Sequence, residues 1–178
     1  MARNAWRVTS KTQTADDVLD ILVETPRGSQ NKMKWDDAAG RFRLSHVLPA
    51  GMSFPFDFGF VPDTRADDGD PVDVLLLTDA GVPMGCLVAA RLVGVIEAEQ
   101  REEGGDTVRN DRLIGVARES KTHGRIRDID DLSPELLKEI EAFFAQYNRL
   151  DGKSFHVLRR RGPSPARAIV KRGRRRVA

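Results

Sequence analysis

The sequence predicts an α+β protein that is mainly β. Two observations carry this prediction: short runs rich in β-branched and aliphatic residues recur along the chain between turn residues, and one helical pattern lies in its last third. With 178 residues, 40% of them apolar and 31% charged, the chain has the composition of one globular domain. We therefore expect a single domain over 1–158 and a basic C-terminal tail over 159–178.

The N-terminal third predicts two strands. The first covers 18–24 and ends at the turn composition of 25–29. The first dozen residues of the chain are polar, and we expect them to be mobile. In the second, Phe42, Leu44 and His46 alternate with polar residues, which gives the period of two typical of a strand. A short connection between the two strands favours a hairpin.

Three further apolar runs predict the central strands, at 72–77, 86–96 and 113–116. A polar loop over 63–70 precedes the first of them. The sole cysteine, Cys86, lies at the start of an apolar run, so we expect a buried thiol and no intrachain disulfide. Residues 97–111 are almost wholly charged or Gly, which predicts an exposed loop or a hairpin tip.

One helix is clear and should cover a face of the sheet. Ser133 can cap it, Pro134 suits its first position, and Gly152 ends it. The apolar residues between them recur at helical spacing: Leu136, Leu137, Ile140, Phe143, Phe144 and Tyr147.

The charge is unevenly distributed. The net charge is +2, but 159–178 hold nine Lys or Arg and no acid, which leaves 20 basic and 27 acidic residues in 1–158. We expect this tail to be solvated, frayed and dispensable for catalysis, although contact with an anionic surface stays open. The acidic body and the 6% of aromatic residues argue against a nucleic-acid-binding domain. No signal peptide or membrane span is evident, which favours a cytoplasmic protein.

The sharpest chemical feature is a cluster of four aspartates: Asp67, Asp68, Asp70 and Asp73. Carboxylates this close repel one another unless a cation lies among them, and oxygen ligands suit Mg²⁺ or Mn²⁺. Gly69 allows the backbone turn that lets them converge, and Pro71 stiffens the entry to the strand. An exposed turn stays open as the alternative. An EF-hand is excluded, because the required Gly and Glu positions hold Asp68 and Val74.

Other catalytic classes find no support. No histidine accompanies a G-x-S-x-G motif, and the zinc motifs based on H-E-x-x-H or paired cysteines are absent. Residues 152–154 end like a phosphate-binding P-loop, but Tyr147 replaces its first glycine and a helix precedes it.

Residues 68–75, with the sequence DGDPVDVL, resemble the signature of the family I soluble inorganic pyrophosphatases. Two upstream segments, 24–32 and 54–60, and three downstream segments, 94–96, 110–113 and 143–147, resemble that family in the same order. The resemblance extends from about Asp17 to about Phe155.

The resemblance implies a distorted five-stranded OB-like β-barrel with flanking α-helices, and hydrolysis of pyrophosphate to two phosphates. It implies Mg²⁺, Mn²⁺ or another divalent cation as cofactor and a homo-oligomer as assembly. Asp70 would be catalytic, and a second carboxylate, Glu24, would support the metal site. The implied metal ligands are Asp68, Asp70 and Asp73. For a further ligand in the charged loop we choose Asp106, with Asp111, Glu102 and Glu103 as alternatives. The implied substrate-binding residues are Lys32, Arg112, Tyr147 and His46, the last with a surface or cap histidine as its alternative.

The sequence departs from the family pattern at seven of these positions: Lys34, His46, Phe54, Phe58, Gln100, Asn110 and Asn148. Two of them, Gln100 and Asn110, stand where the family places metal-binding acids. Because carboxylate number sets much of a site's affinity for hard cations, we expect fewer or weaker metal sites. A catalytically weak or inactive relative that binds a phosphate-containing ligand or a protein partner is the alternative function.

Overall fold

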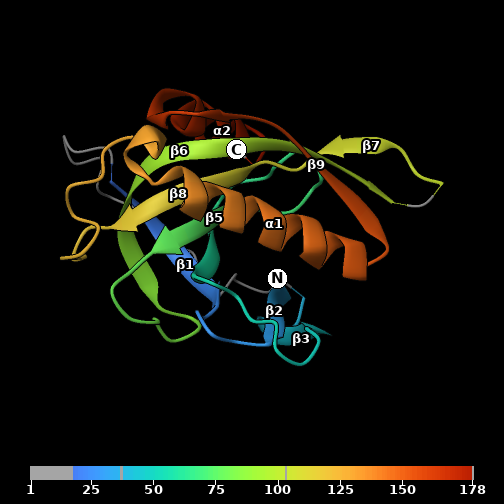
Figure 1. The fold of residues 1–178 in the computed structure, drawn as a ribbon. Coiled ribbons are helices and arrows are strands. Elements are labelled where there is room, and N and C mark those ends of the chain that lie inside the picture. The colour runs from blue at the N-terminus through green and yellow to red at the C-terminus, as the bar shows by residue number, and fades with distance from the viewer. Residues whose placement is uncertain (1–17, 37, 103, 178) are drawn as a thin grey trace.

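The computed structural model describes residues 18–36, 38–102 and 104–177, and it is mainly β with two helices (Figure 1). Five strands form a ring: β1 (Val18–Thr25), β4 (Asp57–Val61), β5 (Val72–Leu77), β8 (Arg112–Ala117) and β6 (Leu87–Glu102). In this ring each strand pairs with the next and β6 pairs again with β1. Only the pair of β5 and β8 is parallel. The predicted OB-like arrangement is confirmed, and bulges keep the ring from closing as a regular barrel.

Four more strands extend this framework. Beyond the ring, β6 pairs with β7 (Thr107–Arg109) and β9 (Lys153–Arg161). A separate hairpin consists of β2 (Asn31–Asp36) and β3 (Arg41–Val47). A 3₁₀ turn, Ile129–Asp131, precedes the first helix.

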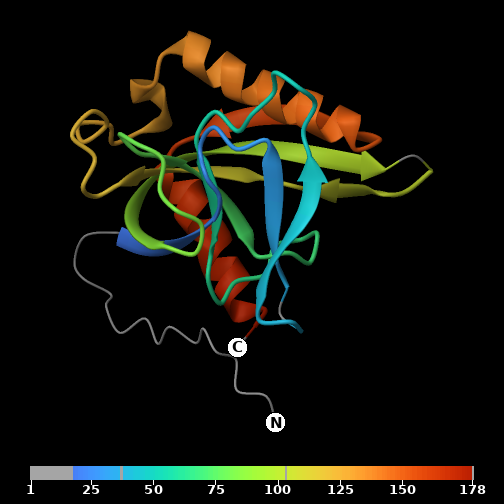
Figure 2. The same cartoon turned by 90° about the horizontal axis from the view of Figure 1, so that it is seen from below.

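Two helices pack on different sides of the sheet, as Figures 1 and 2 show together. Helix α1 (Pro134–Leu150) begins after Ser133, whose hydroxyl accepts a hydrogen bond from the Leu136 amide, as predicted. It buries Leu137, Ile140 and Phe144 in one core cluster. Helix α2 (Pro163–Arg175) buries its apolar residues in the other cluster. Within the described residues, no helix is long and apolar enough to cross a membrane.

Several strand predictions need correction. The strands at 18–24 and 41–46 exist but do not form a hairpin with each other, because β3 pairs with β2 and β1 pairs with β4 and β6. Of the two readings offered for 97–111, the hairpin is confirmed, because β6 and β7 pair there. Cys86 is exposed, because it lies in the turn before β6 and not in the strand. The mobility expected of the first dozen residues falls outside the described residues.

The prediction of a frayed C-terminal tail is wrong. The boundary at 158 falls inside β9, and α2 follows it. The amide of Arg65 donates to the Gly173 carbonyl at 3.1 Å, and a Cβ on Gly173 would lie 2.9 Å from Cγ2 of Val72. Arg172 and Arg176 both pair with Asp67. Helix α2 therefore packs against the loop that carries Arg65 and Asp67. The close approach at position 173 requires glycine.

A pair of adjacent substitutions on α2 tests this packing. We expect Val170→Asp to lower the thermal unfolding midpoint by at least ~5 °C, because Val170 is 3% exposed and the new carboxylate would be buried in an apolar cluster. Its neighbour Lys171 is exposed, so Lys171→Asp should shift the midpoint by no more than about 2 °C. Equal midpoints for the two variants in a calorimetric scan would contradict the packed helix.

Candidate active site

A cleft with a volume of about 770 Å³ lies where the ring of strands meets the β2–β3 hairpin, the β6–β7 hairpin and α1. All nine residues predicted for the site line it: Glu24, Lys32, His46, Asp68, Asp70, Asp73, Asp106, Arg112 and Tyr147. They come from distant parts of the chain. The fold thus brings the whole predicted set to one place.

The aspartate loop presents three of its four carboxylates to the cleft. Gly69 has a φ of 90°, which a residue with a side chain rarely adopts, and the Asp68 carboxylate accepts a hydrogen bond from the Asp70 amide at 3.1 Å. This turn places Asp68 and Asp70 together at the entry to β5, which carries Asp73. Asp67 instead pairs with the arginines of α2, so it has a structural role.

The cleft destabilises negative charge on two of these aspartates. Burial raises the pKa of Asp73 to about 6; the charges of Arg112 and Lys32 oppose this rise, and those of Glu24 and Asp68 add to it. Burial also raises the pKa of Asp68, and the Asp70 charge contributes. Both carboxylates would therefore be stabilised by an added cation.

Two cations in the cleft are held firmly. Lys32 Nζ donates to a carboxylate oxygen of Glu24 at 2.5 Å and lies 4.4 Å from the ring centre of Phe58. The other carboxylate oxygen of Glu24 accepts from the Trp35 amide at 2.8 Å. Glu24, which lies on β1 and is 5% exposed, thus links β1 to β2 and holds Lys32 in position.

Arg112 is the second of these cations. Its Nη1 lies 2.6 Å from Oδ2 of Asp73 and donates to the Asn110 side chain. Its guanidinium lies 5.3 to 5.9 Å from three ring centres, those of Phe58, Phe144 and Phe155. The buried Nε has no hydrogen-bond partner in the described part of the chain. Arg112 therefore has a fixed position at the cleft, as suits a group that binds an anion.

Tyr147, on α1, and His46, on β3, also line the cleft. Burial and the Asp151 charge raise the pKa of Tyr147 well above its ordinary value, so its hydroxyl stays a neutral donor. His46 Nε2 lies 2.9 Å from Oδ1 of Asp151. Asp106 is exposed on the β6–β7 connection, at the rim. No sequence motif pointed to Asp151, because its partner His46 lies far away along the chain.

At most of the positions that depart from the family pattern, the side chains are engaged in hydrogen bonds or ring packing with their neighbours. The Asn110 side-chain amide donates to Oε1 of Gln100 at 2.6 Å, which gives a neutral amide pair where two acids were expected. Asn148 is buried and donates to the Phe144 carbonyl at 2.8 Å. Phe54 and Phe58 are also buried, and their rings pack against each other and α1.

Lys34, which departs from the family pattern, has a partner in the aspartate cluster that the sequence did not predict. Lys34 Nζ lies 2.8 and 2.9 Å from the two carboxylate oxygens of Asp70. Burial lowers the pKa of Lys34, but the hydrogen bond and charge of Asp70 outweigh it, so the pKa is raised and the ammonium stays charged. The signal was available, because Lys32 and Lys34 are two residues apart on one strand and so share a face.

The residues present fit a hard divalent cation by their chemistry. Within the described chain, no three acidic, His or Cys side chains are grouped closely enough to hold a metal as they stand. Lys34 and Arg112 form ion pairs with two of the aspartates. The cleft is nevertheless acidic. Its acidic side chains are Glu24, Asp68, Asp70, Asp73, Glu102, Asp106 and Asp151, against Lys32, Lys34, Arg112 and Lys153. Such a cleft accepts a polyanion only with added positive charge, and its oxygen donors suit Mg²⁺ or Mn²⁺.

Carboxylates for cations, beside cationic and hydroxyl donors for oxyanions, define a phosphohydrolase built on an OB-like ring. A family model described as inorganic pyrophosphatase matches residues 21–178. An inorganic pyrophosphatase from Thermus thermophilus is 39% identical over 139 residues, covering 78% of this chain and 77% of that protein. One from Nostoc sp. is 35% identical over 153 residues, covering 86% and 88%.

Solved structures agree with this result. The crystal structure of the Thermus thermophilus inorganic pyrophosphatase matches with a TM-score of 0.83 at 34% identity and covers 93% of this chain and 94% of that one. An inorganic pyrophosphatase from Helicobacter pylori matches with a TM-score of 0.82 at 32% identity, covering 93% and 96%. The chain belongs to the inorganic pyrophosphatase family.

The raised pKa of Asp73 predicts how stability depends on pH. The carboxyl ionises near 3.8 when unfolded and at about 6 when folded, so the folded state binds more protons between these values. Stability of the chelator-treated protein should therefore fall as pH rises from about 4 to about 6, relative to Asp73→Asn. Mg²⁺ should raise the unfolding midpoint most above pH 6, where Asp73 is ionised. Identical pH profiles for the protein and Asp73→Asn in thermal scans would contradict this assignment.

Proposed function

We propose that this protein hydrolyses inorganic pyrophosphate to two phosphates with the help of divalent cations. One observation supports this most: three aspartates, two fixed cations and a neutral tyrosine hydroxyl, all at positions that match the family motifs, line one cleft. Pyrophosphate needs cationic donors on both phosphoryl groups, and its hydrolysis needs an activated water.

The roles of the side chains follow from their chemistry. Asp68, Asp70 and Asp73 would hold Mg²⁺ or another divalent cation, which supplies charge neutralisation and a water of lowered pKa. Asp70 accepts the proton of the attacking water. Arg112 and Lys32 donate to phosphate oxygens, with the Tyr147 hydroxyl as a further donor. The rings around Arg112 hold it in place while charge moves to the leaving phosphate.

His46 and Asp106 complete the proposal at the two margins of the cleft. His46 would donate to a phosphate oxygen once freed from Asp151, and Asp106 would add an oxygen ligand from the β6–β7 connection. Mg²⁺, Mn²⁺ or another divalent cation as cofactor, a homo-oligomeric assembly and a cytoplasmic location also belong to this proposal.

The direct test measures phosphate released from pyrophosphate by the purified protein in Mg²⁺ and, separately, in Mn²⁺. We expect turnover with at least one of these metals, and none after chelation. No release with either metal, from a protein that unfolds cooperatively, would favour the alternative of a relative that binds a phosphate-containing ligand or a partner without hydrolysis.

A further inference from the structure

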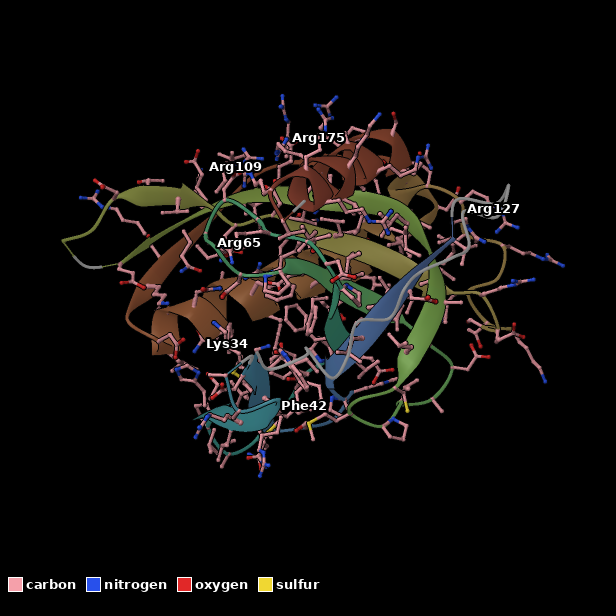
Figure 3. All side chains as sticks on the ribbon, turned by 180° about the vertical axis from the view of Figure 1, so that it is seen from behind. Lys34, Phe42, Arg65, Arg109, Arg127 and Arg175 are labelled. Atoms are coloured by element: carbon pink, nitrogen blue, oxygen red, sulfur yellow. The ribbon has the colours of Figure 1, made fainter. Side chains whose placement is uncertain are left out.

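Lys34 is positioned as a substitute for a bound cation. Its Nζ lies within 2.9 Å of both carboxylate oxygens of Asp70, an arrangement that uses the same two oxygens a divalent cation would use. Figure 3 shows Lys34 on the β2–β3 hairpin, at its side facing the sheet. The ion pair therefore joins the hairpin to the aspartate loop across the cleft.

The pair is accessible and exchangeable. The side chains of Lys34 and Asp70 are 51% and 49% exposed, in contrast to the nearly buried pair of Arg112 and Asp73. An ion pair with this much solvent contact is weak, so a divalent cation can displace the ammonium. The lysine side chain has a flexible stem, and its loss from Asp70 leaves no buried donor unpaired.

Neighbouring residues reinforce the effect of Lys34. The neutral pair of Gln100 and Asn110 adds no charge to bind a cation, so the three aspartates provide much of the negative charge near Lys34. The single positive charge of Lys34, paired with one of these aspartates, therefore offsets a large fraction of the negative charge available to a cation. A divalent cation that binds Asp70 must displace the Lys34 ammonium. The bound cation is then still repelled by that ammonium, which remains nearby.

We propose that Lys34 is a tethered cation that competes with a divalent cation for Asp70 and so lowers the metal affinity of the free protein. The proposal rests on the proposed function, in which Asp70 is a metal ligand. It makes Lys34 a positioning residue: metal binding releases the hairpin from the aspartate loop, and metal removal restores the contact. The metal requirement of the protein is therefore set partly by a side chain on the hairpin.

The test measures Mn²⁺ binding to the protein without substrate. Calorimetric titration and the electron paramagnetic resonance signal of free Mn²⁺ give two independent values of the affinity. We expect Lys34→Gln and Lys34→Met to bind Mn²⁺ on the order of tenfold more tightly, because both remove the competing charge. Lys34→Arg, which keeps the charge, should stay near the original affinity. Lys138→Gln is the matched control, because Lys138 is exposed on α1 and away from the cleft.

A double substitution separates direct competition from a general change of charge. In an Asp70→Asn background, Lys34→Gln should change Mn²⁺ affinity less than twofold, since the contested carboxylate is gone. Unchanged or weaker Mn²⁺ binding by both neutral variants would overturn the proposal. So would an equal gain with and without Asp70. The binding test uses no pyrophosphate, so the two proposals can fail separately. A protein that shows these shifts in Mn²⁺ affinity but releases no phosphate would contradict hydrolysis, while Lys34 would still compete with the cation for Asp70.

Discussion

Asp70→Asn is expected to lower the rate of phosphate release by about 10³-fold, the size typical for loss of a general base. Asparagine keeps the shape of the side chain but removes both the negative charge and the ability to accept a proton. The loss should appear in kcat, because the interaction matters most as the water is deprotonated. Initial rates at saturating pyrophosphate and Mg²⁺ give the comparison.

The same substitution should leave the fold intact. The only ion pair of Asp70 among the described residues is the half-exposed contact with Lys34, whose loss costs about 1 kcal/mol or less. Asp63→Asn is a matched control from the same loop: Asp63 is exposed, lies outside the cleft, and has a φ of 54° that asparagine tolerates. Equal rates for Asp70→Asn and Asp63→Asn would remove Asp70 from the mechanism.

The sequence predicted those elements whose signals are local. Residues 72–77 form the predicted strand because a run that is apolar except at Asp73 is bounded by Pro71 and by polar residues. The helix at 134–150 combines a serine cap, an early proline and regular apolar spacing. Neither needs information from distant parts of the chain.

Elements whose apolar residues are few were missed. In α2 the buried residues Ala166, Ile169, Val170 and Gly173 follow helical spacing, but nine basic residues nearby made 159–178 resemble a solvated tail. The long arginine stems lie along the surface while their charges pair with acids such as Asp67. Composition alone could not distinguish a charged helical face from a frayed terminus.

The site divides in the same way. Short motifs identified the residues that line the cleft, because each motif carries its own turn or strand. The pairing of those residues depends on register and on how the hairpin meets the ring. Lys34 contacts Asp70 because the hairpin approaches the aspartate loop, and Arg112 contacts Asp73 because β5 and β8 run in parallel beside each other. No pattern within either segment specifies these contacts.

Asp57→Ala is expected to have the largest effect on stability, with a loss of about 4 kcal/mol in the free energy of unfolding. Asp57 is fully buried at the start of β4. Its carboxylate accepts hydrogen bonds from the Thr78 hydroxyl at 2.6 Å, the Arg27 amide at 2.8 Å and the Val82 amide at 3.1 Å. Alanine would leave these three donors without their charged acceptor.

The substitution should also disturb the cleft, because the Asp57 carboxylate links β4 to the segments that contain Arg27, Thr78 and Val82. The next residue, Phe58, packs against Lys32 and Arg112, so movement of β4 would displace both cations. Asp20→Ala on β1 is the control, since Asp20 is exposed and its removal should cost no more than ~0.5 kcal/mol. Urea unfolding measures both variants. A difference of less than about 1 kcal/mol between them would show that the three donors find other acceptors, and that the buried carboxylate is not what holds β4 beside the cations of the cleft.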